Sequence, residues 1–267
     1  MLELVILSVG VVVCMGVILG LGIGFTAKIF TIQQDHRIEL VTDALPGVNC
    51  GGCGYAGCAD FAKALVAGKE EVSSCPVCSA ADCCAVADIL GLKVDENTIK
   101  NIAVVLCGGD RANAKQDVEY NGVNDCKSAV LVAGGAKGCK FGCLGLGSCA
   151  AACPFNAIEI TSEGLAVIHA DLCVGCAKCI TTCPKKIIKM VPENVKLHVF
   201  CSSKDKGIDK KKVCSVSCIG CRKCVKKAEP NQMLINGFLV QVNYDLPPSQ
   251  NLIEIAECPT GCLRLSD

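Results

Sequence analysis

The sequence has few aromatic residues and no tryptophan. Aromatic side chains make up only 4% of the 267 residues. Because large aromatic side chains contribute strongly to ordinary cores, a chain with so few of them needs another source of stability. Bound metal clusters can supply it.

Motifs for nucleotide binding are also missing. No Gly-x-Gly-x-x-Gly follows a predicted strand, and no Walker motif occurs. The stretch GLGIG at 20–24 lies inside an apolar run. His36, His169 and His198 lack the spacing of a metal site, so we expect them on the surface or in the core. The sequence therefore predicts no nucleotide, flavin or substrate pocket.

The net charge is zero, but the charges are unevenly distributed. Residues 32–126 carry seven Lys/Arg and fourteen Asp/Glu, whereas residues 185–227 carry thirteen Lys/Arg and three Asp/Glu. The basic region is either a solvated lysine-rich face or a surface that attracts an acidic protein partner.

Residues 4–27 form an uncharged apolar run. As a helix rising ~1.5 Å per residue it is ~36 Å long, which is enough to cross a ~30 Å hydrocarbon core. The run is too long for a signal peptide and follows Glu3 instead of a basic segment, so we predict a retained, single-pass anchor. Lys28 and Arg37 follow the run and no basic residue precedes it, which predicts that the rest of the chain is cytoplasmic. Gly16, Gly20 and Gly24 share one face, where another transmembrane helix could approach closely.

Cysteine is abundant, with 25 residues. Thiols stay reduced in the cytoplasm, so we interpret these cysteines as metal ligands instead of disulfides. The first set is Cys50, Cys53, Cys58 and Cys75, in a glycine-rich stretch followed by a short predicted helix that begins at Cys58 and ends before Gly68. We predict a 4Fe–4S cluster here, because zinc sites usually pair two Cys-x-x-Cys knuckles or one knuckle with histidines. Helical residues Cys78, Cys83 and Cys84 are predicted to be small buried thiols.

The strongest motif is CVGCAKCITTCP at 173–184. It is the full ferredoxin run, in which the fourth cysteine binds the other cluster of a two-cluster module. The ligands are therefore Cys173, Cys176 and Cys179 with the distant Cys153, which Pro154 follows. We number these four the third set, because a second set begins upstream of them. Residues 157–172 between the two runs predict a hairpin that turns near Glu163 and Gly164.

The upstream run is irregular, because Leu146 occupies the second cysteine position. The second set therefore needs a substitute ligand, and Cys139 is the nearest, giving Cys139, Cys143, Cys149 and Cys183. Cys107 and Cys126 are alternatives for the same role.

The chain contains an internal repeat. Residues 138–154 align with 213–230, and VVLC at 104–107 aligns with HVFC at 198–201. The second copy has a regular run, but it carries Ala228 where a complete run has its fourth cysteine, and its partner run keeps only Cys258. In a two-cluster module the fourth cysteine of each run binds the cluster of the other run. If the second copy has lost the cluster of its partner run, position 228 no longer needs a cysteine. The cluster of the regular run is retained and still needs Cys258 as its fourth ligand. The fourth set is Cys218, Cys221, Cys224 and Cys258; the remaining Cys201, Cys214 and Cys262 are expected to be core thiols.

The combination of an apolar anchor, LPGVNCGGCGYAGC with Cys75, GCLGLGSCAAACPFNAI and CVGCAKCITTCP resembles the B subunit of Rnf complexes. These are membrane-bound ferredoxin:NAD⁺ oxidoreductases coupled to ion transport, and the resemblance to their extended form covers nearly the whole chain. It implies an electron-transfer subunit with 4Fe–4S clusters, here four, that accepts electrons from soluble ferredoxin and relays them to membrane or flavin subunits. The acidic ferredoxin would dock on the basic region, including Lys210, Lys211 and Lys212.

Three other interpretations remain: a polyferredoxin subunit of a membrane hydrogenase or similar enzyme, a zinc-stabilised membrane adaptor, and a cluster-based redox sensor. The predicted fold class is α+β. The expected domains are an anchor over 1–30, a helical cluster domain over 31–96, a two-cluster ferredoxin-like module over 97–196, and a one-cluster module over 197–267.

Overall fold

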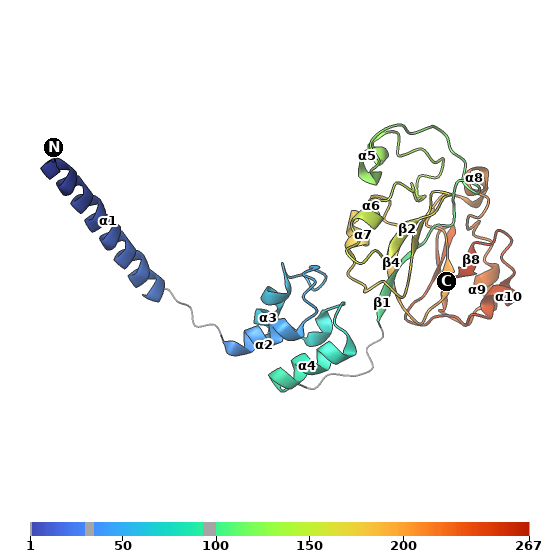
Figure 1. The fold of residues 1–267 in the computed structure, drawn as a ribbon. Helices are drawn as coiled ribbons and strands as arrows, with labels where there is room; N and C mark the ends of the chain where they lie inside the picture. Colours follow the sequence, from blue (N-terminus) through green and yellow to red (C-terminus); the bar gives the residue numbers. More distant parts are fainter. Residues whose placement is uncertain (1, 30–34, 93–99, 267) are drawn as a thin grey trace.

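The computed structural model describes residues 2–29, 35–92 and 100–266 (Figure 1). The fold mixes helices with short strands, as the predicted α+β class requires. The predicted boundaries between the first three domains lie outside the described residues.

Helix α1 (Leu2–Ile29) is the longest element. The 18 residues Val9–Thr26 form a span that is long and apolar enough to cross a membrane. Its large side chains between Val9 and Phe25 are exposed, including Val12 and Leu21. The glycines at 16, 20 and 24 have no neighbouring atoms on their open side. An exposed apolar helix of this length is what a membrane anchor requires.

A small helical unit follows. It contains α2 (His36–Ala44), α3 (Cys58–Val66), a 3₁₀ turn η1 (Val72–Ser74) and α4 (Ala80–Leu90). Val41, Phe61, Leu65 and Val86 form its core. The predicted helix from Cys58 is confirmed, and Gly68 after it has a positive φ of +66°.

The first ferredoxin-like module contains four strands and three helices. Strand β1 (Asn101–Val105) pairs antiparallel with β4 (Ile188–Pro192), and β2 (Ile158–Ile160) forms a hairpin with β3 (Ala166–Ile168). This hairpin confirms the one predicted over 157–172. The helices are α5 (Cys126–Leu131), α6 (Ser148–Ala151) and α7 (Lys178–Thr182).

The second module repeats this topology. Strand β5 (Leu197–Val199) pairs with β8 (Leu263–Leu265), and β6 (Met233–Asn236) forms a hairpin with β7 (Leu239–Val242). Its helices are α8 (Gly207–Val213), α9 (Lys223–Lys227) and α10 (Leu252–Ala256). In both modules the outer strands pair around an inner hairpin, which matches the repeat in the sequence.

The two modules meet along the segments that follow their first strands. The Gly108 N–H donates to the Phe200 carbonyl, and the Ser202 hydroxyl donates to the Leu106 carbonyl. Farther along, Ala114 and Cys214 form an antiparallel bridge. We call this contact, formed by residues 106–115 and 199–217, the junction.

Candidate metal-cluster sites

The first predicted set of cysteines surrounds one cavity. Cys50, Cys53, Cys58 and Cys75 all line a space of about 310 Å³. The Gly52 N–H donates to the Cys50 sulfur at 3.4 Å, and the Cys58 N–H donates to Asn49 Oδ1 at 2.7 Å. A hydrogen bond from the Cys78 thiol lowers the pKa of Cys75 to about 6. Because thiolates are the metal-binding form, this loop is suited to hold a cluster.

The three cysteines after this set differ in position. Cys78 precedes α4, whereas Cys83 and Cys84 lie on it. Cys78 and Cys83 are half-buried, but Cys84 is exposed. The prediction of a buried thiol is therefore wrong for Cys84, because the short helix turns this side chain towards solvent.

The third predicted set also surrounds one cavity. Cys153, Cys173, Cys176 and Cys179 line a space of about 330 Å³. The Ala103 N–H donates to the Cys173 sulfur at 3.4 Å, so strand β1 contributes to this site. Burial, with smaller contributions from Cys173 and Cys176, raises the pKa of Cys179 to about 12. Metal binding to such thiols would release protons.

The second cavity has a different fourth cysteine from the one predicted. Cys126, Cys143, Cys149 and Cys183 line a space of about 360 Å³, and Cys139 is not in its lining. Burial raises the pKa of Cys149 to about 11, with smaller contributions from Cys143, Cys126 and Cys183. The structure therefore groups the predicted Cys143, Cys149 and Cys183 with Cys126, the alternative that the sequence left open.

Local hydrogen bonds explain how Cys126 reaches this cavity. The Asp125 carboxylate caps α5 by accepting the Ser128 N–H at 2.8 Å. The Ser148 hydroxyl donates to Asp125 Oδ1 at 2.8 Å and accepts the Cys126 N–H at 2.7 Å. These bonds from Ser128 and Ser148 hold the pKa of Asp125 at about 2. They tie the start of α5 to the start of α6, which carries Cys149.

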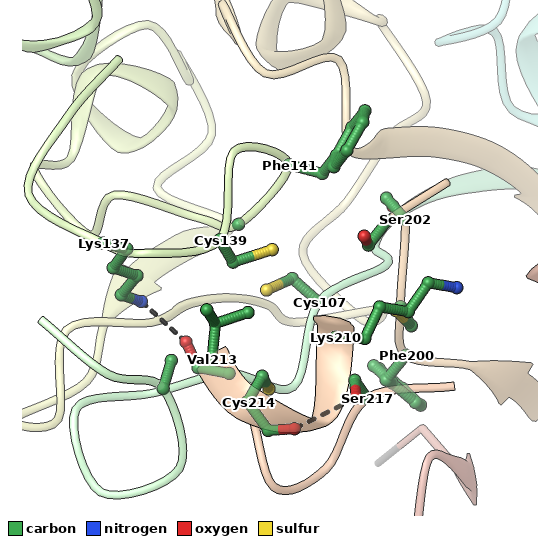
Figure 2. A pocket seen from close by; sticks show the side chains of 15 residues that line it. Cys107, Lys137, Cys139, Phe141, Phe200, Ser202, Lys210, Val213, Cys214 and Ser217 are labelled. Carbon is green, nitrogen blue, oxygen red and sulfur yellow. Dashed lines mark hydrogen bonds between the residues drawn. The ribbon is translucent and has the colours of Figure 1, made fainter. Parts of the chain in front are cut away.

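Cys139 lies beside the junction. It lines a separate cavity with Cys107, Cys201 and Cys214. Figure 2 labels Cys107, Cys139 and Cys214 around this cavity. Cys107 was the other alternative for the second set, and it too lies here. The one sequence signal of this grouping was the repeat, which aligns Cys107 with Cys201 and Cys139 with Cys214.

The fourth predicted set gathers around α9. Burial raises the pKa of Cys224 to about 11, and the Cys218, Cys221 and Cys258 thiols contribute to the rise. Cys221 is exposed, so this site lies at the surface. Ala228 packs against the core of the second module, where no thiol is needed. Cys262 is buried there and hydrogen-bonds to Cys201 and Cys218, whereas Cys201 and Cys214 are only half-buried.

The thiol sets differ from a site for one metal ion. Four thiolates around a single zinc would lie about 3.8 Å apart. Among the residues the structure describes, no three Cys, His, Asp or Glu side chains are arranged to hold a single ion. The cysteines instead face cavities, and four thiolates around a space suit a 4Fe–4S cluster.

The basic region contains buried and exposed lysines. Lys210 is only 1% exposed, and its Nζ donates to the carbonyls of Cys218 at 3.0 Å and Phe238 at 2.9 Å. It is therefore no part of a docking surface, contrary to the expectation from the sequence. The exposed basic residues nearest the fourth set lie on or beside α9: Arg222, Lys223, Lys226 and Lys227.

Comparison with protein families gives two matches. Residues 45–77 match a family described as "Putative Fe-S cluster", and residues 137–187 match the 4Fe-4S dicluster domain. The first match contains the first thiol set, and the second contains most of the second and third sets.

Several proteins are similar over nearly the whole chain. The B subunit of the Na(+)-translocating ferredoxin:NAD(+) oxidoreductase complex of Acetobacterium woodii is 38% identical over 98% of this chain and 78% of its own length. The B subunit of the ion-translocating oxidoreductase complex of Methanosarcina acetivorans is 37% identical over 99% of this chain and 100% of its own length. The B subunit of the proton-translocating ferredoxin:NAD(+) oxidoreductase complex of Clostridium ljungdahlii is 37% identical over 98% of this chain and 93% of its own length.

Proposed function

Since the chain belongs to the family of B subunits of ion-translocating oxidoreductase complexes, we propose that it takes electrons from reduced ferredoxin and relays them within such a complex. It is an iron–sulfur electron-transfer subunit of the complex. The observation that carries the relay is the set of thiol groups around cavities of similar size. Ion movement itself would belong to partner subunits, including membrane and flavin subunits.

We assign four 4Fe–4S clusters in this proposal. Three keep their predicted ligands, and the second takes Cys126 in place of Cys139. The assigned ligands are Cys50, Cys53, Cys58 and Cys75; Cys126, Cys143, Cys149 and Cys183; Cys153, Cys173, Cys176 and Cys179; and Cys218, Cys221, Cys224 and Cys258. Bound clusters would carry single electrons, with their potentials set by N–H···S bonds, burial and nearby charge.

The anchor supports a single-pass placement in the cell membrane. The apolar span Val9–Thr26 supports the anchoring, and Lys28 and Arg37 after it support a cytoplasmic location of the cluster domains. Soluble ferredoxin would then reach them directly. The domain division from the sequence is kept in this proposal.

The fourth site is the proposed point of electron input. Its exposed Cys221 brings the cluster near the surface, and the exposed lysines of α9 surround it with positive charge. An acidic ferredoxin would be steered to such a patch, and steering weakens as salt screens the charges.

Charge reversal tests this docking surface. In Lys223→Glu/Lys226→Glu/Lys227→Glu, we expect the rate of reduction by ferredoxin to fall about tenfold or more at low salt and the difference to shrink at high salt. Stopped-flow absorbance of the full chain in detergent measures the rate. The matched control reverses the exposed Lys63, Lys69 and Lys115, which lie elsewhere. Equal rates for both triple variants would reject docking at α9.

A further inference from the structure

We propose that Cys107, Cys139, Cys201 and Cys214 bind a fifth 4Fe–4S cluster at the junction of the two modules. The proposal rests on the proposed function, because it adds a site to the same relay. None of these four cysteines is a ligand in the four assigned sites.

The cavity at the junction resembles the other three. The space between its lining residues, including the part open to solvent, is about 410 Å³, against about 310, 330 and 360 Å³ at the first, third and second sites. In Figure 2 the sulfur atoms of Cys107 and Cys139 point towards one another. Burial raises the pKa of Cys214 to about 11, with smaller contributions from the nearby thiols of Cys107, Cys139 and Cys201. Four thiols thus face one space of suitable size.

Backbone N–H groups already point at these sulfur atoms. The Cys143 N–H donates to the Cys107 sulfur at 3.4 Å. A backbone N–H group two residues later, in Phe141, Ser203 and Val216, lies beside the thiols of Cys139, Cys201 and Cys214, respectively. The assigned ligands Cys143, Cys176 and Cys218 have an N–H neighbour at the same offset. Such N–H···S bonds stabilise thiolate ligands and tune cluster potentials.

The ligands follow the internal repeat. Cys107 lies two residues after β1, and Cys201 lies two residues after β5. Cys139 and Cys214 each lie four residues before the first cysteine of their module's ferredoxin run. Each module therefore contributes the same two ligands, so this geometry explains four cysteines that the ferredoxin pattern leaves unused.

Two buried lysines line the same cavity. Lys137 and Lys210 are 7% and 1% exposed, and Lys137 Nζ donates to the Gly109 carbonyl at 2.6 Å. Neither forms an ion pair with a carboxylate within the described ranges. A buried charge is costly without a partner. Four thiolates carry more negative charge than the iron–sulfide core carries positive charge, so a bound cluster would supply the missing counter-charge.

The junction site lies between two assigned sites. Cys143 is a ligand of the second site and donates its N–H to Cys107. Cys218 of the fourth site has its backbone N–H beside the Cys201 thiol. In each step one electron would move: the neighbouring reduced cluster is oxidised and the junction cluster is reduced, with no bond made and no proton moved. The fifth cluster would connect electron input at α9 with the first module.

Iron and acid-labile sulfide per chain test the proposal, measured with zinc on the full chain purified anaerobically in detergent. Five clusters give about twenty iron and twenty sulfide, and four give about sixteen. We expect Cys107→Ala and Cys214→Ala each to lose about four iron and four sulfide. The matched control Cys84→Ala, at an exposed thiol, should lose none.

Three results would overturn or redirect the inference. A wild-type count of about sixteen iron that stays the same in Cys214→Ala would reject the fifth cluster. One zinc per wild-type chain that is lost in Cys214→Ala would also reject it, because the site would then bind zinc. Absence of iron from the wild type would instead reject the proposed function. If a variant fails to fold and loses every cluster, the iron count of the wild-type chain still decides between five clusters, with about twenty iron, and four clusters, with about sixteen.

Discussion

At the residue scale, position in space decides which cysteine can serve a cluster. Leu146 removes one ligand from a regular run, and Cys139 is the nearest cysteine in sequence. The hydrogen bonds of Asp125 and Ser148 instead bring Cys126 to the second site. Sequence spacing finds a ligand that belongs to a regular cysteine run, whereas Cys126 belongs to none and is brought to the site by the fold.

A double substitution distinguishes the two cysteines. If Cys126 and Cys139 serve different clusters, Cys126→Ala and Cys139→Ala should each lose about four iron, and the double variant about eight. Iron analysis with low-temperature EPR spin counting measures the losses. A double variant that loses only four iron would place both cysteines at one cluster, and Cys84→Ala controls for losing any thiol.

At the element scale, β5 carries a buried titratable group. His198 is fully buried, its Nδ1 lies 3.2 Å from the Tyr244 hydroxyl, and its Nε2 has no partner among the described residues. Burial, with a smaller contribution from Lys196, lowers the pKa of His198 to about 4. The strand is therefore built around a neutral imidazole.

The buried imidazole of His198 should make the folded protein less stable in acid. Between pH ~6.5, the usual histidine value, and pH ~4, the unfolded chain binds a proton that the folded chain does not. The free energy of unfolding should therefore fall as pH drops through this window, and His198 should contribute no pH dependence above it. Urea unfolding at pH 7.5 and 5 measures this. In His198→Phe the drop should be smaller, and an unchanged drop would assign it to other groups.

Local elements were predictable where local patterns determine them. The alternation over 157–172 predicted the β2–β3 hairpin, and Gly68 marked the end of α3. Residues 106–137 lack such a pattern, because their course depends on distant partners: the Lys115 N–H donates to the Val213 carbonyl, and the Asp117 N–H to the Ala136 carbonyl. Likewise, charge counting could not reveal that Lys210 points inward to two carbonyls.

At the scale of the whole molecule, the helical unit contacts the first module beside two cluster sites. A Cβ built on Gly52 would lie 2.8 Å from the Pro76 side chain and 3.4 Å from the Cys176 backbone. Gly52 lies between two ligands of the first site, and Cys176 is assigned to the third. The small residue thus permits close approach of the two sites.

Enlarging Gly52 should separate these sites. In Gly52→Leu we expect iron content to stay the same and electron exchange between the first site and the rest to slow, since the added side chain pushes the units apart. Freeze-quench EPR after rapid reduction follows the exchange. Ala56→Leu adds the same bulk at an exposed position of the same loop. Equal kinetics in both variants would mean that the two sites do not exchange electrons through this contact.

The matching contributions of both modules to the junction also bear on how the chain can change. One strand-end thiol and one loop thiol from each half are the pattern of an isologous interface in a symmetric homodimer. In such a dimer every mutation of a ligand residue changes two ligands of the shared site at once. Within a single chain it alters one, so the halves are free to diverge: Leu146 aligns with Cys221, and Cys153 aligns with Ala228. Two halves joined in one chain can therefore form a directional arrangement of sites, which a symmetric dimer cannot.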